Sequence, residues 1–366
     1  MGRNTEILNQ PTIMPEQMRV LEKLCNALAV SGNETEARRL VMDQIKPYVE
    51  EMRTDALGNL LAFQKKESRK TLRVMIAAHL DEVGFMLTSE EDREEGIYRF
   101  ELVGGIDPRW LAGKPVQVGA EHAKGVIGCK AIHLTTAEER RNPFTVDGLR
   151  VDMGGGGKAK VGDWGTFATP FQKIGGSIRA KALDDRIGVA TAIELLKYEY
   201  PDLDLLVAFT VQEEVGLRGA KVAAHALNPD LAIVLDCTPA YDLPLQIEDS
   251  FYPPENEKYN TRLGHGPAIY LSDRATISDP RLVAHFVQTA EKLGIPYQFR
   301  QAGGGGTDAG AIHLQRAGIP SISISVPGRY LHTPASLVRI ADWENTLRLV
   351  YHSLQRLSAD VLQTER

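Results

Sequence analysis

The sequence predicts an α/β fold in which a mixed, largely parallel sheet is flanked by helices and carries an inserted all-β domain. Segments with helical spacing alternate with short apolar runs near both ends of the chain, a pattern typical of a parallel sheet covered on both faces. Between them lies a region of short β-like segments broken by glycines. A chain of 366 residues is also long for one hydrophobic core. We therefore assign residues 10–81 and 171–360 to the α/β domain and residues 82–170 to the insertion.

Two helices and two strands are expected in the first part of the α/β domain. The helices are residues 16–30, whose apolar side chains recur at helical spacing, and residues 35–48. The strands are residues 56–63 and 72–78. The second strand is an apolar run that ends abruptly in the letters HLDE, so polar side chains are expected at its end.

The insertion and the second part of the α/β domain differ in their spacing of apolar residues. The insertion contains β-like segments at 98–103, 115–118 and 125–132, and its glycine run is interpreted as a turn because no Lys-Ser/Thr pair follows it. Asp279 and Pro280 are suited to the N-cap and the first position of a helix. The second part predicts helices at 184–198, 217–225, 280–293, 307–317 and 343–357, and strands at 205–211, 231–235 and 321–326.

Composition excludes several classes of function. No apolar run approaches the roughly 18 residues needed to cross a bilayer, so no membrane partner is expected. The N-terminal residues do not have the pattern of a secretory signal, and three scattered cysteines suit a reducing cytoplasm. A formal charge of −6 without a dense Lys/Arg tract argues against nucleic acid and favours cations as ligands.

Acids and histidines recur where the predicted buried strands of the α/β part give way to loops, which is where open α/β sheets assemble active sites. A lone histidine at such a place is usually structural. Two histidines and three carboxylates together, however, suit two divalent ions and leave one carboxylate to handle a proton. The residues concerned are His79 with Asp81, Asp184 with Asp185, Glu213 with Glu214, Asp236 and His332.

Two other interpretations of these residue types are less favoured. Glu213 and Glu214 could be the carboxylate pair of a glycosidase, but such pairs face each other across a substrate, whereas adjacent residues leaving a strand point apart. One ligand and one base is the better division. The remaining histidines lack partnering acids in the sequence and are not expected to be ligands: His122, His133, His225, His265, His285, His313 and His352.

Five segments of the chain, taken together and in this order, resemble the tetrahedral (TET) aminopeptidases, which are metallopeptidase family 42 of clan MH and include glutamyl, leucyl and deblocking aminopeptidases. The resemblance extends from about residue 15 to residue 357 and implies a zinc-exopeptidase-like fold. The segments are AHLDEVG at 78–84, KALDDR at 181–186, QEEVGLRGA at 212–220, GGTDAG at 305–310 and LHTP at 331–334.

The resemblance implies a role for each site residue. Asp184 is expected to bridge two divalent ions, zinc or cobalt. His79 and Asp236 would complete one metal site, and Glu214 and His332 the other. Glu213 corresponds to the general base, which takes a proton from a water acidified by the two cations and attacking a peptide carbonyl. Asp81 corresponds to the acid that holds the histidine ligand. The turn at 303–306 with Thr307 and Asp308 corresponds to a loop that lines the substrate pocket.

The resemblance also implies a quaternary structure, because in the family the insertion is a dimerisation domain from which a hollow dodecamer is built. A homododecamer made of dimers, acting on peptides, is therefore expected. Extra residues between 242 and 264 lie near the expected specificity pocket. They leave the preferred N-terminal residue open, and uncharged or mixed N-termini are expected. A preference for acidic N-termini would indicate a basic group, His265 or Arg274 first.

Two rival functions remain open. Another amide hydrolase of the same clan, a carboxypeptidase or an N-acyl deacylase, would need an arginine facing the metals, and Arg274 or Arg329 are the candidates. A catalytically dead assembly or binding protein on this scaffold is the alternative from a different class. The intact Glu213 and the complete ligand set argue against it.

Overall fold

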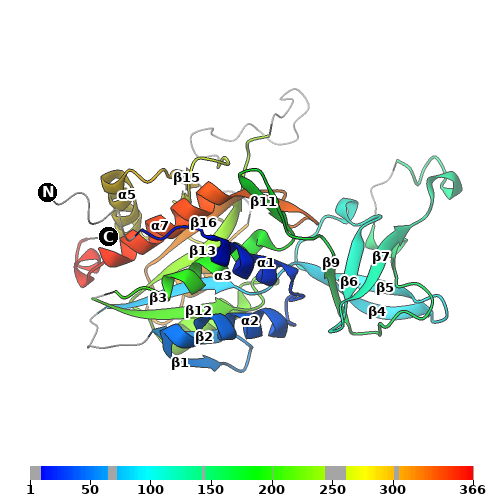
Figure 1. The fold of residues 1–366 in the computed structure, drawn as a ribbon, viewed down its shortest axis with the longest axis horizontal. Helices are drawn as coiled ribbons and strands as arrows, with labels where there is room; N and C mark the ends of the chain where they lie inside the picture. Colours follow the sequence, from blue (N-terminus) through cyan, green and yellow to red (C-terminus); the bar gives the residue numbers. More distant parts are fainter. Residues whose placement is uncertain are drawn as a thin grey trace.

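The computed structural model describes residues 10–64, 72–141, 145–200, 202–243, 261–300 and 305–365. An α/β body forms one end of the molecule and a β-barrel forms the other (Figure 1). This arrangement confirms the predicted fold class. Among the described residues, no helix is both long enough and apolar enough to cross a membrane.

The sheet of the α/β body has a parallel centre and antiparallel edges. β12, β3, β13 and β16 run parallel to one another in this order, and the strands that pair with the outer sides of β12 and β16 are antiparallel to them. The order is β1 (Val49–Thr54), β2 (Leu60–Gln64), β12 (Leu203–Thr210), β3 (Leu72–His79), β13 (Leu231–Pro239), β16 (Ser321–Arg329), β17 (Ser336–Arg339), β11 (Ser177–Ala180) and β10 (Gln172–Ile174), with β14 (Ala268–Tyr270) on β16 and β15 (Gln298–Arg300) on β14.

Helices cover both faces of this sheet because its central strands are apolar on both faces. Along β3, Val74 and Ile76 belong to the core on one face, and Met75 and Ala77 belong to the core on the other. The first face is covered by α1 (Pro15–Asn26), α2 (Thr35–Ile45), α3 (Leu183–Leu195), α5 (Pro280–Leu293) and α7 (Ile340–Gln355), and the second by α4 (Arg218–Leu227) and α6 (Ala309–Ile312).

The barrel is closed and has its own core. Phe85, Phe100 and Val116 are buried in it, and the Phe85 and Phe100 rings pack edge to face with centroids 5.2 Å apart. Every strand pair is antiparallel, in the order β4 (Gly84–Asp92), β5 (Ile97–Val103), β8 (Leu149–Asp152), β7 (Ala123–Cys129), β6 (Pro115–Val118) and β9 (Trp164–Phe167). Short 3-10 turns occur at Lys46–Tyr48, Pro108–Trp110, Ile132–Leu134, Val146–Gly148 and Ala359–Leu362.

The structure differs from the sequence prediction mainly at edges and helix ends. β1 was not predicted because Glu50 and Glu51 interrupt any alternation, as an exposed edge strand allows. The helix predicted at 307–317 is helical only over Ala309–Ile312, because the chain then turns back and Ile319 packs into the core beside α4. By contrast, α5 begins at Pro280 as predicted, and the Asp279 carboxylate accepts the N–H of Arg281.

Candidate metal centre

The carboxyl ends of the central parallel strands meet at one edge of the sheet. His79 is the last residue of β3 and is paired in register with Thr210, the last residue of β12. Asp236 lies near the end of the neighbouring strand β13. A cavity of about 340 Å³ opens at this edge. Its wall comprises His79, Asp184, Glu213, Asp236, Cys237, Pro239, Tyr270, Asp273, Arg300, Gly305, Gly306, Leu331 and His332.

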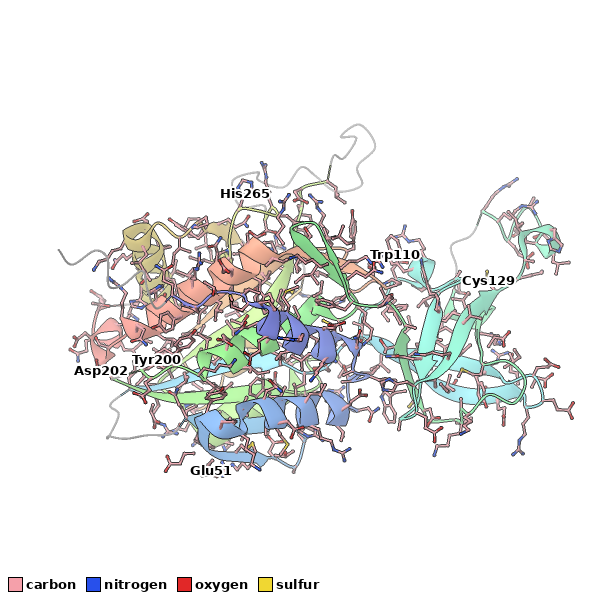
Figure 2. All side chains as sticks on the ribbon, viewed as in Figure 1. Glu51, Trp110, Cys129, Tyr200, Asp202 and His265 are labelled. Atoms are coloured by element: carbon pink, nitrogen blue, oxygen red, sulfur yellow. The ribbon has the colours of Figure 1, made fainter. Side chains whose placement is uncertain are left out.

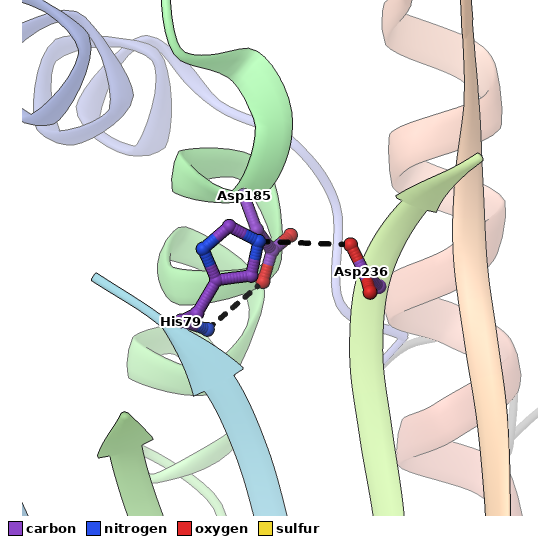
Figure 3. Close-up of side chains that lie close together, drawn as sticks. All are labelled: His79, Asp185 and Asp236. Atoms are coloured by element: carbon purple, nitrogen blue, oxygen red, sulfur yellow. Dashed lines mark hydrogen bonds and ion pairs between the residues drawn. The ribbon is translucent and has the colours of Figure 1, made fainter. Parts of the chain in front are cut away.

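His79, Asp185 and Asp236 form a first group whose potential ligand atoms lie within 4.8 Å of one another (Figure 3). The His79 Nε2 is 3.8 Å from an oxygen of Asp236. The two Asp185 oxygens accept main-chain N–H groups of Gly188 at 3.0 Å and His79 at 3.3 Å. Gly188 has to be glycine here, because a Cβ would lie 2.3 Å from the Asp185 carboxylate. Asp185 was not among the predicted ligands. Because both of its oxygens accept main-chain N–H groups, its carboxylate holds the backbone at this point.

Asp184, Glu214 and His332 form a second such group. The His332 Nε2 is 3.4 Å from both an Asp184 oxygen and a Glu214 oxygen. The other Asp184 oxygen is 3.2 Å from the His79 Nε2. The Asp184 carboxylate therefore lies between the two histidines and faces one with each oxygen. All five residues for which the sequence implied a ligand role lie together at this point.

The Nδ1 atoms of both histidines face main-chain carbonyls. His79 Nδ1 is 3.1 Å from the carbonyl oxygen of Asp81, and His332 Nδ1 is 3.0 Å from that of Gly105, in the loop that follows β5 of the barrel. A carbonyl can only accept, so each Nδ1 carries a proton. Each Nε2 faces the Asp184 carboxylate, to which it donates when it is protonated, and it can bind a cation when it is not.

The Asp81 carboxylate has a different set of contacts from the one expected. It is 3.6 Å from the His79 Nδ1, farther than the Asp81 carbonyl. Its oxygens instead accept the N–H groups of Glu213 at 3.0 Å and Glu214 at 3.2 Å, and the hydroxyl of Ser31. Asp81 therefore holds the Glu213–Glu214 turn more directly than it holds the imidazole.

A tight turn after β12 carries the two adjacent glutamates. Gln212 adopts a left-handed conformation with φ 55°, and Gly219 approaches the end of β12 so closely that a Cβ would lie 2.3 Å from the Val211 carbonyl oxygen. Glu213 then lines the 340 Å³ cavity, whereas Glu214 lines a smaller cavity with Asp184 and His332. The adjacent glutamates thus face different spaces.

Buried negative charge is concentrated at this edge. Burial raises the pKa of Glu213 well above its ordinary value, and repulsion from Glu214 adds to the effect. Burial also raises the pKa of Glu214 to about 7 and that of Asp236 well above its ordinary range. For Asp184, burial acts in the same direction, but hydrogen bonds from His332 and His79 lower its pKa. Divalent cations would offset this charge, and the carboxylate and imidazole donors fit zinc, cobalt or manganese.

The structure places a different basic residue in the cavity wall from those that the sequence suggested. Arg329 is a wrong candidate for a clamp, because its guanidinium is bound to Asp242 with N–O distances of 2.6 and 2.8 Å. Arg274 and His265 are exposed and do not line the cavity, and His265 lies on the outer surface of the α/β body (Figure 2). The arginine in the wall is Arg300, on a strand too short to be predicted from sequence.

Three further expectations need correction or lie outside the described residues. Of the loop expected to line the substrate pocket, Gly305 and Gly306 do line the cavity, whereas Asp308 is buried and accepts the hydroxyl of Thr210, and Thr307 is bonded to Ser323. His122 does have an acid partner, since its Nε2 lies 2.8 Å from Glu36. Most of the extra segment at 242–264, namely residues 244–260, and residues 303–304 of the glycine turn lie outside the described residues.

Comparison with known proteins identifies the family of this chain. The model of the M42 glutamyl aminopeptidase family matches residues 58–349. The chain belongs to this family. As an M42 enzyme it is a peptidase, and a curated relative, the lysyl aminopeptidase of Pyrococcus furiosus, is 30% identical to it over 92% of this chain and 96% of the relative.

Solved structures of TET peptidases share this fold over most of the chain. A TET aminopeptidase from a marine sediment Thaumarchaeota archaeon has a TM-score of 0.87 and 32% identity, and the match covers 95% of this chain and 99% of that one. The TET1 peptidase of Pyrococcus horikoshii, which can assemble into a tetrahedron or a large octahedral shell, has a TM-score of 0.80 and 30% identity, with 93% of this chain and all of that chain covered.

Proposed function

We propose that this M42 peptidase is a dinuclear metal-dependent aminopeptidase in which Glu213 is the general base. The observation that carries the proposal is the Asp184 carboxylate, whose oxygens lie 3.2 Å from His79 and 3.4 Å from His332. One carboxylate shared by two histidine-containing groups is the arrangement that two neighbouring cations require. His79 and Asp236 would hold one ion with Asp184, and Glu214 and His332 the other.

The residues around this centre divide the chemistry among themselves. Two divalent cations bound here supply acidification of a water and polarisation of the substrate carbonyl. Glu213, in the cavity wall beside Asp184, takes the proton of the attacking water and returns it to the leaving amine. Asp81 holds the Glu213 main chain while this happens.

We propose a mixed substrate preference. Apart from Glu213 and the proposed ligands, the cavity wall contains one carboxylate, Asp273, and one guanidinium, Arg300. A preference for only acidic or only basic N-terminal residues would require side chains of a single sign of charge at this part of the wall. Arg300 is also the residue that would bind the C-terminal carboxylate of a substrate if the protein were the rival carboxypeptidase. Uncharged N-terminal residues are expected to be cleaved best.

Metal removal and substrate screening together test the proposed function. Dialysis against a chelator is expected to abolish hydrolysis of aminoacyl chromogenic substrates, and zinc, cobalt or manganese is expected to restore it, because in the proposed mechanism the cations acidify the water and polarise the carbonyl. Blocked peptides and peptides with only a free C-terminus serve as controls and should resist cleavage. Full turnover by protein shown to be metal-free would contradict the metal mechanism, and preferred release of C-terminal residues would favour the carboxypeptidase.

We also propose that the chain forms a homo-oligomer built from dimers, with the dodecamer as the expected size. The β-barrel, whose strands run from Gly84 to Phe167, supplies the dimer contacts in this proposal. Deletion of residues 82–170 should therefore give smaller particles with impaired activity on peptides. Light scattering on the intact protein and on the deletion variant measures this, and a monomeric intact protein at micromolar concentration would contradict it.

A further inference from the structure

A second cluster of buried charges lies beside the metal centre. The Lys181 Nζ is 2.8 Å from both oxygens of Glu82, and an Arg186 nitrogen is 3.3 Å from one of them. All three side chains are at most 3% exposed. The Lys181 ammonium group and the Arg186 guanidinium therefore share one carboxylate where water does not reach them. Burial of these charges costs free energy unless each charge has its partner. The three side chains therefore keep a strict geometry.

This cluster joins the two segments that carry the first metal ligands. Glu82 lies three residues after His79, and Lys181 and Arg186 stand on either side of the Asp184–Asp185 pair. Arg186 also donates to the carbonyl oxygen of Leu80, directly after His79. Glu82 and Lys181 line the small cavity that Asp184, Glu214 and His332 also line. The ion cluster is therefore in contact with the same space as the second group of ligands.

The barrel reaches the same carboxylate. The Thr166 hydroxyl, on β9 of the barrel, donates to Glu82 at 2.9 Å, and the N–H of Ala29 donates to its other oxygen at 3.1 Å. Gly105, from another barrel loop, supplies the carbonyl that fixes His332. Glu82, which follows the His79 segment directly, thus accepts bonds from Ala29, from the barrel and from the segment that carries Asp184.

We propose that Glu82 is a positioning residue for the metal centre: its carboxylate locks the barrel, the end of β3 and the Asp184 segment into the geometry in which the ligands converge. This rests on the proposed dinuclear function. It makes the barrel part of the active-site scaffold in addition to any role in assembly. Glu82 touches neither substrate nor reacting atoms and acts only through the ligands that it aligns.

A purely electrostatic role of the cluster would have an opposite signature. The cluster carries two positive charges and one negative charge, so Lys181→Met removes positive charge near the cations. If charge alone mattered, this substitution would strengthen metal binding. If alignment matters, it weakens metal binding, because Glu82 loses the partner that holds both of its oxygens. Whether Lys181→Met strengthens or weakens metal binding therefore separates the two explanations.

The experiment titrates the full-length, metal-free protein with Co²⁺ and Zn²⁺, followed by calorimetry and by the visible absorption of bound cobalt. Glu82→Gln is expected to raise the metal dissociation constant about 10–100-fold, the usual effect of losing a group that orients ligands. Lys181→Met should shift it in the same direction, and Thr166→Val less so, because it removes one hydrogen bond. When these variants are assayed with aminoacyl substrates at saturating metal, kcat should change by a larger factor than KM.

Glu194→Gln is the matched control. Glu194 is also buried and bound to a lysine, with its oxygen 2.8 Å from Lys197, but it lies at the far end of α3. It should lose thermal stability without a change in metal affinity or in the cobalt spectrum. Should Glu82→Gln not fold, Thr166→Val decides the matter.

Three outcomes would overturn the inference: unchanged metal affinity in Glu82→Gln or in Thr166→Val, tighter binding in Lys181→Met, or an equal loss in Glu194→Gln. Failure of the proposed function is recognised separately, since the native protein itself would then bind fewer than two cations or hydrolyse substrate without them.

Discussion

Replacement of Glu213 by glutamine will lower kcat by a factor of about 10²–10⁴ and leave both cations bound. Glutamine keeps the size of the side chain but cannot accept a proton from the attacking water. Glu213 lines the 340 Å³ cavity, and it is not a member of either group of potential ligand atoms among the described residues. Its loss should therefore affect proton transfer only. Metal content by calorimetry and kcat on an aminoacyl substrate measure the two properties independently.

Glu214→Gln is the matched control, because the same substitution is made one residue later. Glu214 lies 3.4 Å from the His332 Nε2, and its replacement should lower metal affinity at that site. Excess metal should then restore part of the activity of Glu214→Gln and none of the activity of Glu213→Gln. The reverse pattern would show that base and ligand have been assigned the wrong way round.

Asp184→Asn is expected to be the most damaging change to a ligand, with loss of tight binding at both metal sites. One Asp184 oxygen faces His79 and the other faces His332, so a neutral amide weakens both groups at once. An amide offers only one good acceptor atom and no negative charge to two cations. Metal analysis after gel filtration, together with kcat/KM at saturating metal, measures the effect.

Asp236→Asn provides the comparison for Asp184→Asn. Asp236 belongs to the His79 group alone, so its variant should keep one cation on the Glu214 and His332 side. Two tightly bound cations per chain in Asp184→Asn would contradict the bridging role. Loss of both cations in Asp236→Asn would show instead that the two sites fill only together.

The fold class followed from the sequence because its signals are local. A buried parallel strand such as β3 is a continuous apolar run, and α5 begins with an acid that accepts an N–H and a proline that fits the first turn. Edge strands carry no such signal. β1 is largely exposed, and β14 and β15 have three residues each, so their pairing depends on neighbours far away in sequence.

The residue types of the metal centre could also be recognised from the sequence. Parallel strands bring their carboxyl ends to one edge, so acids and histidines after β3, β12 and β13 had to lie near one another. Their division into groups could not be predicted without the resemblance to a family, because it depends on the directions of individual side chains. Nor could the sequence show that the main-chain carbonyl of Asp81 lies closer to the His79 Nδ1 than the Asp81 carboxylate does.

What the sequence by itself determined is therefore the order of helices and strands, the inserted β region and the set of residues that meet at the sheet edge, since each depends on spacing along the chain. Only the tertiary structure decided which charges lie side by side without water between them. Glu82, Lys181 and Arg186 are 99 to 104 residues apart where they pair across two segments, and Gly105 is 227 residues from His332. Contacts over such separations arise when segments that are far apart in the chain pack together, for which a single sequence has no local signature.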